Sequence, residues 1–235
     1  MNILAIDTSN QVLGVAVLNN EQVIGEIVTN ISKNHSVRLM PAVDKLMKEV
    51  SMRPDQLDKI VVAKGPGSYT GVRIGIATAK SLAWSLDIPI TGVSSLEVLA
   101  YQGRFFDGYI CPFFDARRGL VFSGVYKWNK DTLDLVFKEE NMLMEDLLNK
   151  LSEENQQVLF LSPDILLHED SIKNNMSDRA VIPEGPYHLP RAAHLGLAGM
   201  NRAPDNTHAL TPNYLRLAEA EVNWLNAKKD LEKNG

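Results

Sequence analysis

The sequence predicts an α/β protein, and three observations support this class. Three short aliphatic strands open the chain and are separated by turn residues. A short apolar strand at residues 60–63 then leads into a glycine-rich turn and an apolar-periodic helix over residues 72–86. The same order of strands, helix and strand restarts after residue 108. This restart predicts two lobes built on one plan.

Composition predicts a folded globular protein. With 235 residues, 45% of them apolar, the chain can bury two compact lobes or one large core. Cys111 is the single cysteine, and no cysteine and histidine cluster has zinc-site spacing, so a reducing cytoplasm is the expected compartment. The N-terminal segment has no basic region, and Asp7 interrupts its apolar run. We therefore expect neither a signal peptide nor a membrane span.

Charge gives no sign of direct nucleic-acid binding. The formal net charge is −5, and the 24 lysine and arginine residues are scattered along the chain. An RNA-handling role would then need a partner that supplies the positive surface.

The first three strands are expected at residues 3–7, 13–18 and 23–28, as an antiparallel meander. Asp7, Thr8 and Ser9 end the first strand. In phosphotransferases of the actin and sugar-kinase class, a similar Asp-x-Gly turn approaches phosphate and metal. The glycine is missing here, so a capping or turn role for Asp7 is favoured over a metal role.

Residues 35–50 are expected to form a helix with a wide apolar stripe. That stripe exceeds what one face of a small sheet needs, which predicts two neighbours. Pro41 marks either the helix start or a kink. His35 is more typical of a cap or a solvated side chain than of a catalytic group. The apolar positions are Val37, Leu39, Met40, Val43, Leu46, Met47 and Val50.

The sequence GPGSYTG at residues 65–71 is the centre of the chain. Its glycines permit positive φ or close backbone approach, and Ser68 or Thr70 can cap the following helix. A helix start of this kind attracts anions. The alternative is a tight internal turn with no ligand. The candidate nucleotide- or anion-binding set is Asp7, Thr8, Ser9, Gly65, Gly67, Ser68, Thr70 and Gly71.

Small residues recur at every fourth position of the helix after this turn, at Gly71, Gly75, Ala79 and Ala83. They fall on one side, where a second helix can approach closely. A helical glycine costs about 1 kcal/mol relative to alanine, so Gly75 indicates a contact that needs the space. Packing of this row inside its own fold is the competing interpretation.

A strand at 89–93 and a short helix at 94–101 complete a first lobe, 1–102, which leaves 103–235 for the second. The second lobe has predicted strands at 109–115, 120–126, 132–138 and 158–161 and a helix at 144–151. Asp115 takes the place of Asp7. Arg117 and Arg118 beside it suit an anion, a partner or an internal ion pair.

Residues 162–190 give no clear assignment. A small-residue helix is expected at 191–199, and an amphipathic segment starts at Pro212. The final helix is expected to pack back on the first lobe. Residues 228–233 resemble a solvated helix end or tail.

Several motifs occur in a fixed order: AIDTS at 5–9, His35-Ser36 with LMP at 39–41, the 65–75 segment with Ala79-Lys80, and YLR at 214–216. Together they resemble the TsaB (YeaZ) family, bacterial proteins of threonylcarbamoyladenosine biosynthesis on tRNA and paralogues of TsaD. The likeness is strong over residues 1–125 and thin beyond.

The resemblance implies an actin-like fold of the acetate-kinase, sugar-kinase and Hsp70 class, with two duplicated ribonuclease-H-like lobes. It also implies a non-catalytic subunit that binds and activates a TsaD-like threonylcarbamoyl transferase. A TsaE-like ATPase joins that complex, tRNA binds only through it, and the chain alone forms a homodimer. The implied interface residues are Ser36, Leu39, Met40, Val43, Met47, Val72, Gly75, Ile76, Ala79 and Ala83.

The resemblance also separates a scaffold from an enzyme. TsaD-like enzymes carry two metal-binding histidines one helical turn apart, and Ser95 and Leu99 stand at those positions here. Leucine offers no lone pair and serine is a poor ligand, so no catalytic residue, metal or cofactor is expected.

Two other functions remain open. An ATP-dependent small-molecule kinase of the same fold would need Asp-x-Gly turns and a glycine-rich adenosine loop, for which GLAG at 196–199 is a poor candidate. A homodimeric regulatory module would differ mainly in its partner.

Overall fold

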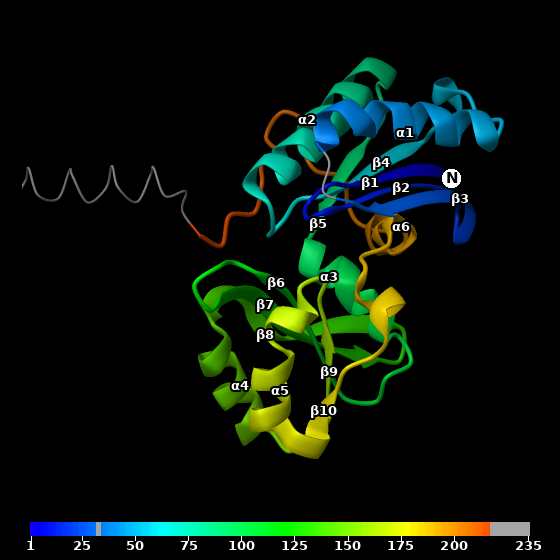
Figure 1. Cartoon of the computed structure of the whole chain (residues 1–235). Helices are drawn as coiled ribbons and strands as arrows, with labels where there is room; N and C mark the ends of the chain where they lie inside the picture. Colours follow the sequence, from blue (N-terminus) through cyan, green and yellow to red (C-terminus); the bar gives the residue numbers. More distant parts are fainter. Residues whose placement is uncertain (32–33, 217–235) are drawn as a thin grey trace, which may run out of the picture.

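The chain forms two α/β lobes stacked one above the other (Figure 1). The computed structural model describes residues 1–31 and 34–216. The first lobe contains a five-stranded sheet with the order β3-β2-β1-β4-β5. Its strands are β1 (Asn2–Asp7), β2 (Val12–Asn19), β3 (Gln22–Asn30), β4 (Lys59–Ala63) and β5 (Ile90–Val93).

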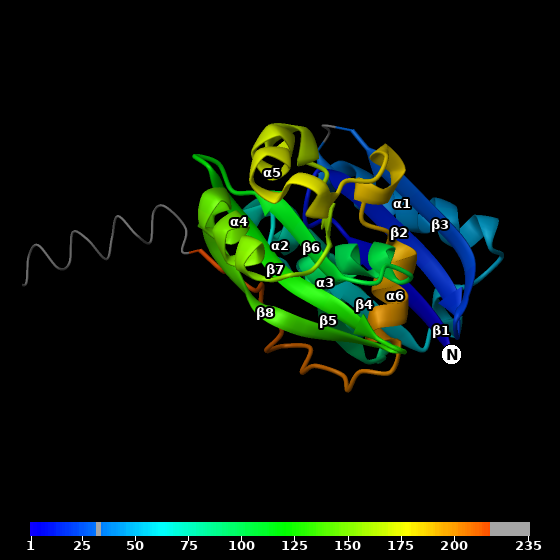
Figure 2. The same cartoon turned by 90° about the horizontal axis from the view of Figure 1, so that it is seen from below.

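The central strands of this sheet are buried on both faces. Every residue of β4 is buried, and β4 runs parallel to β1 with Leu4 opposite Ile60. A sheet covered on both sides explains why the strands read as continuous aliphatic runs. Helices α1 (His35–Glu49) and α2 (Tyr69–Leu86) cover one face, and α6 (Ala192–Met200) covers the other (Figures 1 and 2).

The second lobe repeats this plan. Its sheet has the order β8-β7-β6-β9-β10, which matches β3-β2-β1-β4-β5 strand for strand. In both sheets the first strand pairs antiparallel with the second and parallel with the fourth. The predicted duplication is therefore confirmed. The strands are β6 (Tyr109–Asp115), β7 (Leu120–Asn129), β8 (Thr132–Leu143), β9 (Val158–Leu161) and β10 (Ala180–Val181).

Helices α4 (Met144–Glu153) and α5 (Glu169–Met176) pack on the second sheet. The sequence predicted α4 within two residues but missed α5 and β10, which lie in the segment without clear periodicity. Pro41 does not start α1, because it lies inside the helix. The described part of the expected C-terminal amphipathic segment, residues 212–216, is not helical, and the rest lies outside the described residues.

The chain returns to the first lobe after the second sheet is complete. Helix α6 contacts β1 and β2, and Lys59 of β4 donates hydrogen bonds to the carbonyl oxygens of Gly199, Met200 and Arg202 at 2.8, 3.1 and 2.8 Å. A cation at a helix C-terminus is favourable because the last carbonyls carry partial negative charge. The first lobe therefore depends on residues that follow the second in sequence.

Helix α3 (Ser95–Ala100) lies between the lobes (Figure 1). Leu96 and Leu99 are fully buried and pack against Ile110 and Phe114 of the second sheet. This apolar contact joins the lobes. Among the helices of the described residues, none combines the length and the hydropathy that crossing a membrane requires.

Candidate functional site

The glycine turn packs directly on the turn that follows β1. A Cβ on Gly67 would lie 2.0 Å from the carbonyl oxygen of Ser9, and one on Gly71 would lie 2.1 Å from that of Thr8. These distances are far below van der Waals contact, so glycine is required at both positions. The predicted close backbone approach is present, and its partner is the chain's own β1 turn.

Several amide groups of the glycine turn are engaged within the protein. The Ser68 N–H donates to Ser9 O at 2.6 Å, and the Gly71 N–H donates to the Ser68 side chain at 3.2 Å. The Gly65 N–H donates to Ser95 Oγ at 3.1 Å. Ser68, rather than Thr70, is therefore the N-cap of α2. These amides are not available to a phosphate, which favours the internal-turn interpretation.

Asp7 closes the β1 turn. Its Oδ1 accepts hydrogen bonds from the Ser9 N–H at 2.8 Å and the Ser9 hydroxyl at 2.7 Å. Asp7 is only 2% exposed, and burial raises the pKa of its carboxyl group, although the hydrogen bonds from Ser9 oppose this shift. This geometry fits the turn role that the sequence favoured.

The small-residue row of α2 faces inward. Gly75 lies against Thr8, whose Oγ1 would be 2.5 Å from a Cβ there, and Ala79 and Ala83 are at most 1% exposed. The expectation that this row is an open docking surface is therefore wrong; it packs inside its own fold. Two predicted docking residues, Ser36 and Met40, are exposed. The eight buried ones are Leu39, Val43, Met47, Val72, Gly75, Ile76, Ala79 and Ala83.

The outward sides of the same two helices retain large apolar side chains. Val37 and Met40 of α1 are 69% and 45% exposed, and Trp84 of α2 is 72% exposed. Apolar surface is therefore exposed on the outward sides of both helices. The sequence did not predict Trp84 as an interface residue. The predicted interface was the row of small residues, which lies on the opposite side of α2.

Ser95 and Leu99 have structural contacts of their own. Ser95 Oγ accepts a hydrogen bond from the Gly65 N–H, and the Ser95 N–H donates to Gly65 O at 3.0 Å. Leu99 is fully buried in the apolar contact between the lobes. In the described part of the chain, no three His, Cys, Asp or Glu side chains gather closely enough to hold a metal ion.

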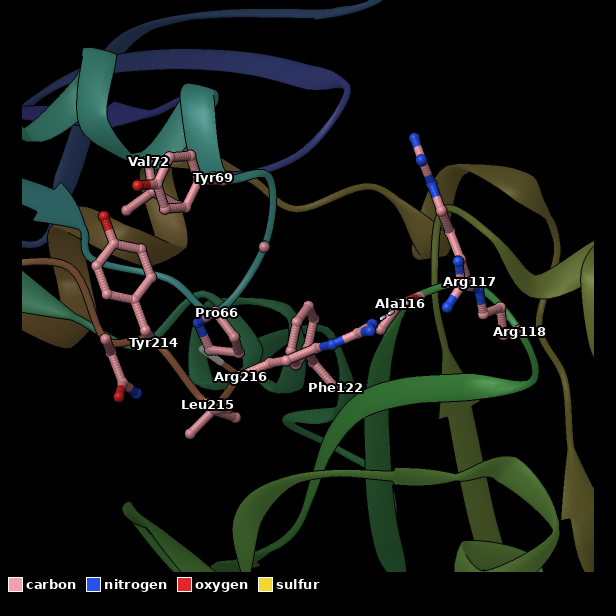
Figure 3. A pocket seen from close by; sticks show the side chains of 12 residues that line it. Pro66, Tyr69, Val72, Ala116, Arg117, Arg118, Phe122, Tyr214, Leu215 and Arg216 are labelled. Atoms are coloured by element: carbon pink, nitrogen blue, oxygen red, sulfur yellow. Dashed lines mark hydrogen bonds between the residues drawn. The ribbon is translucent and has the colours of Figure 1, made fainter. Parts of the chain in front are cut away.

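A pocket of about 370 Å³ opens between the lobes beside the glycine turn (Figure 3). Tyr69 and Val72 of α2 line one side, and the segment 116–118 after β6 lines the other. Residues 213–216 line a further side of the pocket, and Tyr214 stacks on Tyr69 with ring centroids 5.4 Å apart. Within residues 1–31 and 34–216, the lining is formed by Pro66, Gly67, Tyr69, Val72, Ala116, Arg117, Arg118, Phe122, Asn213, Tyr214, Leu215 and Arg216.

Arg117 and Arg118 lie at the rim of this pocket, as Figure 3 shows. His168 pairs with Asp115, with Nε2 3.1 Å from Oδ1. The sequence did not identify Tyr69, Tyr214 or Arg216 as site residues. Tyr214 and Arg216 belong to the YLR motif, which was the one feature of the sequence that could have indicated them as site residues.

Two duplicated lobes of this topology, a buried contact between them and a pocket at their junction define a protein of the actin-like class. The sugar-kinase and Hsp70 proteins share this class, so the fold alone leaves the activity open.

Comparison with known proteins identifies the family. The family model for TsaD, tRNA N6-adenosine threonylcarbamoyltransferase, matches residues 22–224. The TsaB protein of Bacillus subtilis (strain 168) is 51% identical over 229 residues, covering 97% of this chain and 100% of that protein. The TsaB protein of Escherichia coli (strain K12) is 30% identical over 162 residues, which cover 66% and 69% of the two chains.

A solved structure agrees with these relatives. YeaZ from Pseudomonas aeruginosa superposes with a TM-score of 0.78 at 27% identity, covering 91% of this chain and 99% of that one. The chain belongs to the TsaB family of tRNA threonylcarbamoyladenosine biosynthesis proteins, which carry the TsaD-type domain.

Proposed function

We propose that this chain is a non-catalytic subunit that binds and activates a TsaD-like threonylcarbamoyl transferase. The observation that carries the proposal is the exposure of Val37, Met40 and Trp84 on the outward sides of α1 and α2. Exposed apolar groups of this size are typical of residues at the centre of protein interfaces. Membership of the TsaB family supports a TsaD-like protein as the partner.

The contacts of Ser95 and Leu99 support the non-catalytic part of the proposal. A leucine side chain fixed in the contact between the lobes cannot ligate a metal, and the Ser95 hydroxyl is engaged by the Gly65 amide. The chemistry of threonylcarbamoyl transfer would then take place on the partner. Without that partner, the same apolar side chains suit a homodimer.

Further parts of the proposal extend to the assembly. A TsaE-like ATPase would join the two-protein complex, and the complex as a whole would present tRNA to the transferase. The chain would act in the cytoplasm, where tRNA is modified. The first lobe, 1–102, would carry the partner helices, and 103–235 would form the second lobe. Packing of α6 on β1 modifies this division, because the first lobe also needs 192–200.

Reconstitution tests this function. The chain, a TsaD-like transferase and a TsaE-like ATPase are combined with tRNA and the threonylcarbamoyl donor, and modified adenosine is measured by mass spectrometry. We expect modification with the complete set and none when this chain is omitted or is used alone. Modification at an undiminished rate without the chain would contradict the activating role. Metal-dependent transfer by the chain alone would contradict the non-catalytic role.

The kinase alternative makes a different prediction for the same protein. A kinase of this fold needs amide groups that are free to bind phosphate, whereas the amides of Gly65, Ser68 and Gly71 donate to protein oxygens. We expect little ATP turnover by the purified chain.

A further inference from the structure

The pocket between the lobes collects cationic and aromatic side chains from three distant parts of the sequence. We propose that it binds a phosphodiester of single-stranded RNA, with Arg117, Arg118 and Arg216 contacting phosphate oxygens and Tyr69 and Tyr214 contacting a base or ribose. This inference deepens the proposed function and rests on it for the source of the RNA, the tRNA substrate. It assigns this chain itself a direct RNA contact, whereas the sequence predicted only that tRNA binds through the complex.

The charge of the pocket differs from that of the whole chain. The protein carries a formal net charge of −5, but the pocket lining, as far as the described residues supply it, includes three arginines and no aspartate or glutamate. Arginine presents a planar set of N–H donors that match phosphate oxygens, and several such groups around one pocket attract a polyanion. The described lining is therefore cationic, and the carboxylates of Asp115 and Asp164 line the adjoining pocket.

The backbone holds the two neighbouring arginines in an uncommon conformation. Arg117 and Arg118 have φ values of 66° and 56°, in the left-handed region that non-glycine residues rarely adopt. The turn is fixed by the Arg117 N–H, which donates to Asp115 Oδ2 at 3.1 Å, and by the Leu120 N–H, which donates to Arg117 O at 3.1 Å. A tight turn between antiparallel strands such as β6 and β7 requires positive φ, and it fixes both arginines at this end of the hairpin.

Arg216 enters the pocket from the C-terminal segment. Its Nη1 donates to Ala116 O at 3.3 Å, which brings its guanidinium group beside the arginine turn (Figure 3). The preceding chain is anchored on the first lobe, because the Asn213 N–H donates to Lys64 O at 2.7 Å. Arginines from two distant parts of the sequence therefore supply one cationic rim.

The aromatic side of the pocket has the composition of an RNA-binding surface. Tyr69 and Tyr214 stack with an interplanar angle of 28°, and the Arg73 guanidinium carbon lies 3.6 Å from the centroid of Tyr69. The two tyrosines remain 45% and 42% exposed. Proteins that bind single strands combine cationic grooves with aromatic rings on which bases stack. A cavity of about 370 Å³ is large enough for part of a nucleotide.

An RNA phosphodiester fits this pocket better than a free nucleoside triphosphate. A triphosphate usually binds with Mg²⁺, which needs oxygen ligands such as carboxylates, and the described residues of the lining offer none. In the adjoining pocket, Asp115 pairs with His168 and Asp164 accepts the Asp115 N–H. Cradling the phosphates also requires backbone amides, and Ser68 and Gly71 of the neighbouring turn donate theirs to protein oxygens. A phosphodiester carries one charge per nucleotide and needs only the arginines.

Fluorescence anisotropy with the full chain tests the site. The probe is a labelled RNA oligonucleotide with the sequence of a tRNA anticodon arm, titrated at several salt concentrations. The test variant is Arg117→Glu/Arg118→Glu, and Arg53→Glu is the control, since Arg53 is exposed and lies in the first lobe, outside the pocket lining. Thermal unfolding and pull-down with the transferase are measured for each variant.

We expect the double variant to bind the RNA at least about tenfold more weakly, with the slope of log affinity against log salt reduced by about 0.7 for each phosphate that is no longer neutralised. Arg53→Glu should bind as the wild type does, and Tyr214→Ala should weaken binding with little change in the salt slope. The double variant and Tyr214→Ala should both still bind the transferase in the pull-down. Loss of RNA binding can then be distinguished from failure of the proposed docking.

Three results would overturn the inference. One is the absence of saturable RNA binding by the wild-type chain. Another is equal loss of affinity in the double variant and in Arg53→Glu. The third is displacement of the RNA by ATP or by a polyglutamate peptide at concentrations below those that unlabelled RNA requires, which would assign the pocket to a free nucleotide or an acidic protein segment.

Discussion

Gly67 and Ser9 lie so close that a Cβ on Gly67 would be 2.0 Å from the Ser9 carbonyl oxygen. The same carbonyl accepts the Ser68 N–H at 2.6 Å. The glycine turn and the turn after β1 are therefore one packed unit. This contact explains both the glycines of the central motif and the loss of free amides for a phosphate ligand.

Replacing Gly67 by alanine is expected to destabilise the protein strongly. Gly67 has φ of 153°, and the new methyl group would collide with backbone rather than with a movable side chain. We expect a loss of about 3 kcal/mol or more in the free energy of unfolding, because both strain and displaced backbone contribute. Denaturant unfolding measures the loss.

Gly185→Ala is the matched control. No heavy atom lies within 4 Å of a Cβ at Gly185, and its φ is not in the positive region. Its stability should equal or slightly exceed that of the wild type, since alanine reduces the entropy of the unfolded chain. Equal stabilities of the two variants would refute the packed turn.

Charged substitutions on the outward sides of α1 and α2 should prevent docking without unfolding the chain. Met40→Glu and Trp84→Glu place a carboxylate on exposed positions, so folding should be almost unaffected. Binding to the transferase should weaken by about 2 kcal/mol or more for Trp84→Glu, roughly 30-fold, since buried aromatic groups dominate interface energies. Titration calorimetry measures the affinity for the transferase, and pull-down detects its loss.

Leu166→Glu controls for the removal of an exposed apolar group. Leu166 is 81% exposed on the second lobe and belongs to neither helix, so its replacement should leave docking intact. Substitutions in the small-residue row, such as Gly75→Leu and Ala79→Glu, do not test docking. Both positions are buried, so we expect these variants to unfold. Wild-type affinity in Met40→Glu and Trp84→Glu would place the interface elsewhere.

Asp7→Asn should change how stability depends on pH. Burial raises the pKa of Asp7 above its ordinary value of 3.8 in the folded protein, so the unfolded chain releases this proton first. The wild type therefore loses stability as the pH rises above 3.8 toward the folded pKa. Asparagine retains an oxygen that accepts from Ser9 and carries no charge.

The asparagine variant should accordingly gain stability over the wild type from acidic to neutral pH, and this gain should vanish at low pH. Chemical unfolding at a series of pH values measures both curves. Parallel curves for the two proteins would show that the Asp7 carboxyl does not titrate differently in the folded state.

Lys59→Met should loosen α6 from the first lobe. Lys59 is 4% exposed, and its Nζ is the hydrogen-bond donor to three carbonyls at and just after the end of α6. We expect a loss of about 2 kcal/mol or more, since carbonyls that lose a charged donor in a buried site are not compensated. Hydrogen exchange should rise in α6.

Lys48→Met provides the comparison. Lys48 forms an exposed pair with Asp44, and such pairs contribute about 0–1 kcal/mol. Equal effects of the two substitutions would mean that Lys59 does not hold α6.

Most strands and the longer helices followed from local pattern. The aliphatic runs of β1, β2 and β4 and the periodicity of α4 depend on neighbouring residues in the sequence, and the structure confirms them within one or two residues. Helix α5 and strand β10 were missed because their apolar residues are few and are separated by polar ones and prolines.

The site was less accessible from sequence. A row of small residues predicts that something packs closely, but the periodicity is the same whether that neighbour is another protein or the chain's own Thr8. Trp84 showed its exposure only in the folded molecule. The sequence did not predict that Arg117 and Arg216 form one cationic cluster, because they lie far apart along the chain.

The sequence by itself determined the α/β class, the repeated order of elements, the need for glycine at the central turn and, through its motifs, the family. The tertiary structure alone decided which side of α2 is covered, that α6 completes the first lobe, and that cationic and aromatic side chains meet in the interlobe pocket. The physical reason is that hydrogen bonding and apolar periodicity act over a few residues. Burial and local charge, in contrast, depend on which distant segments the completed fold brings together.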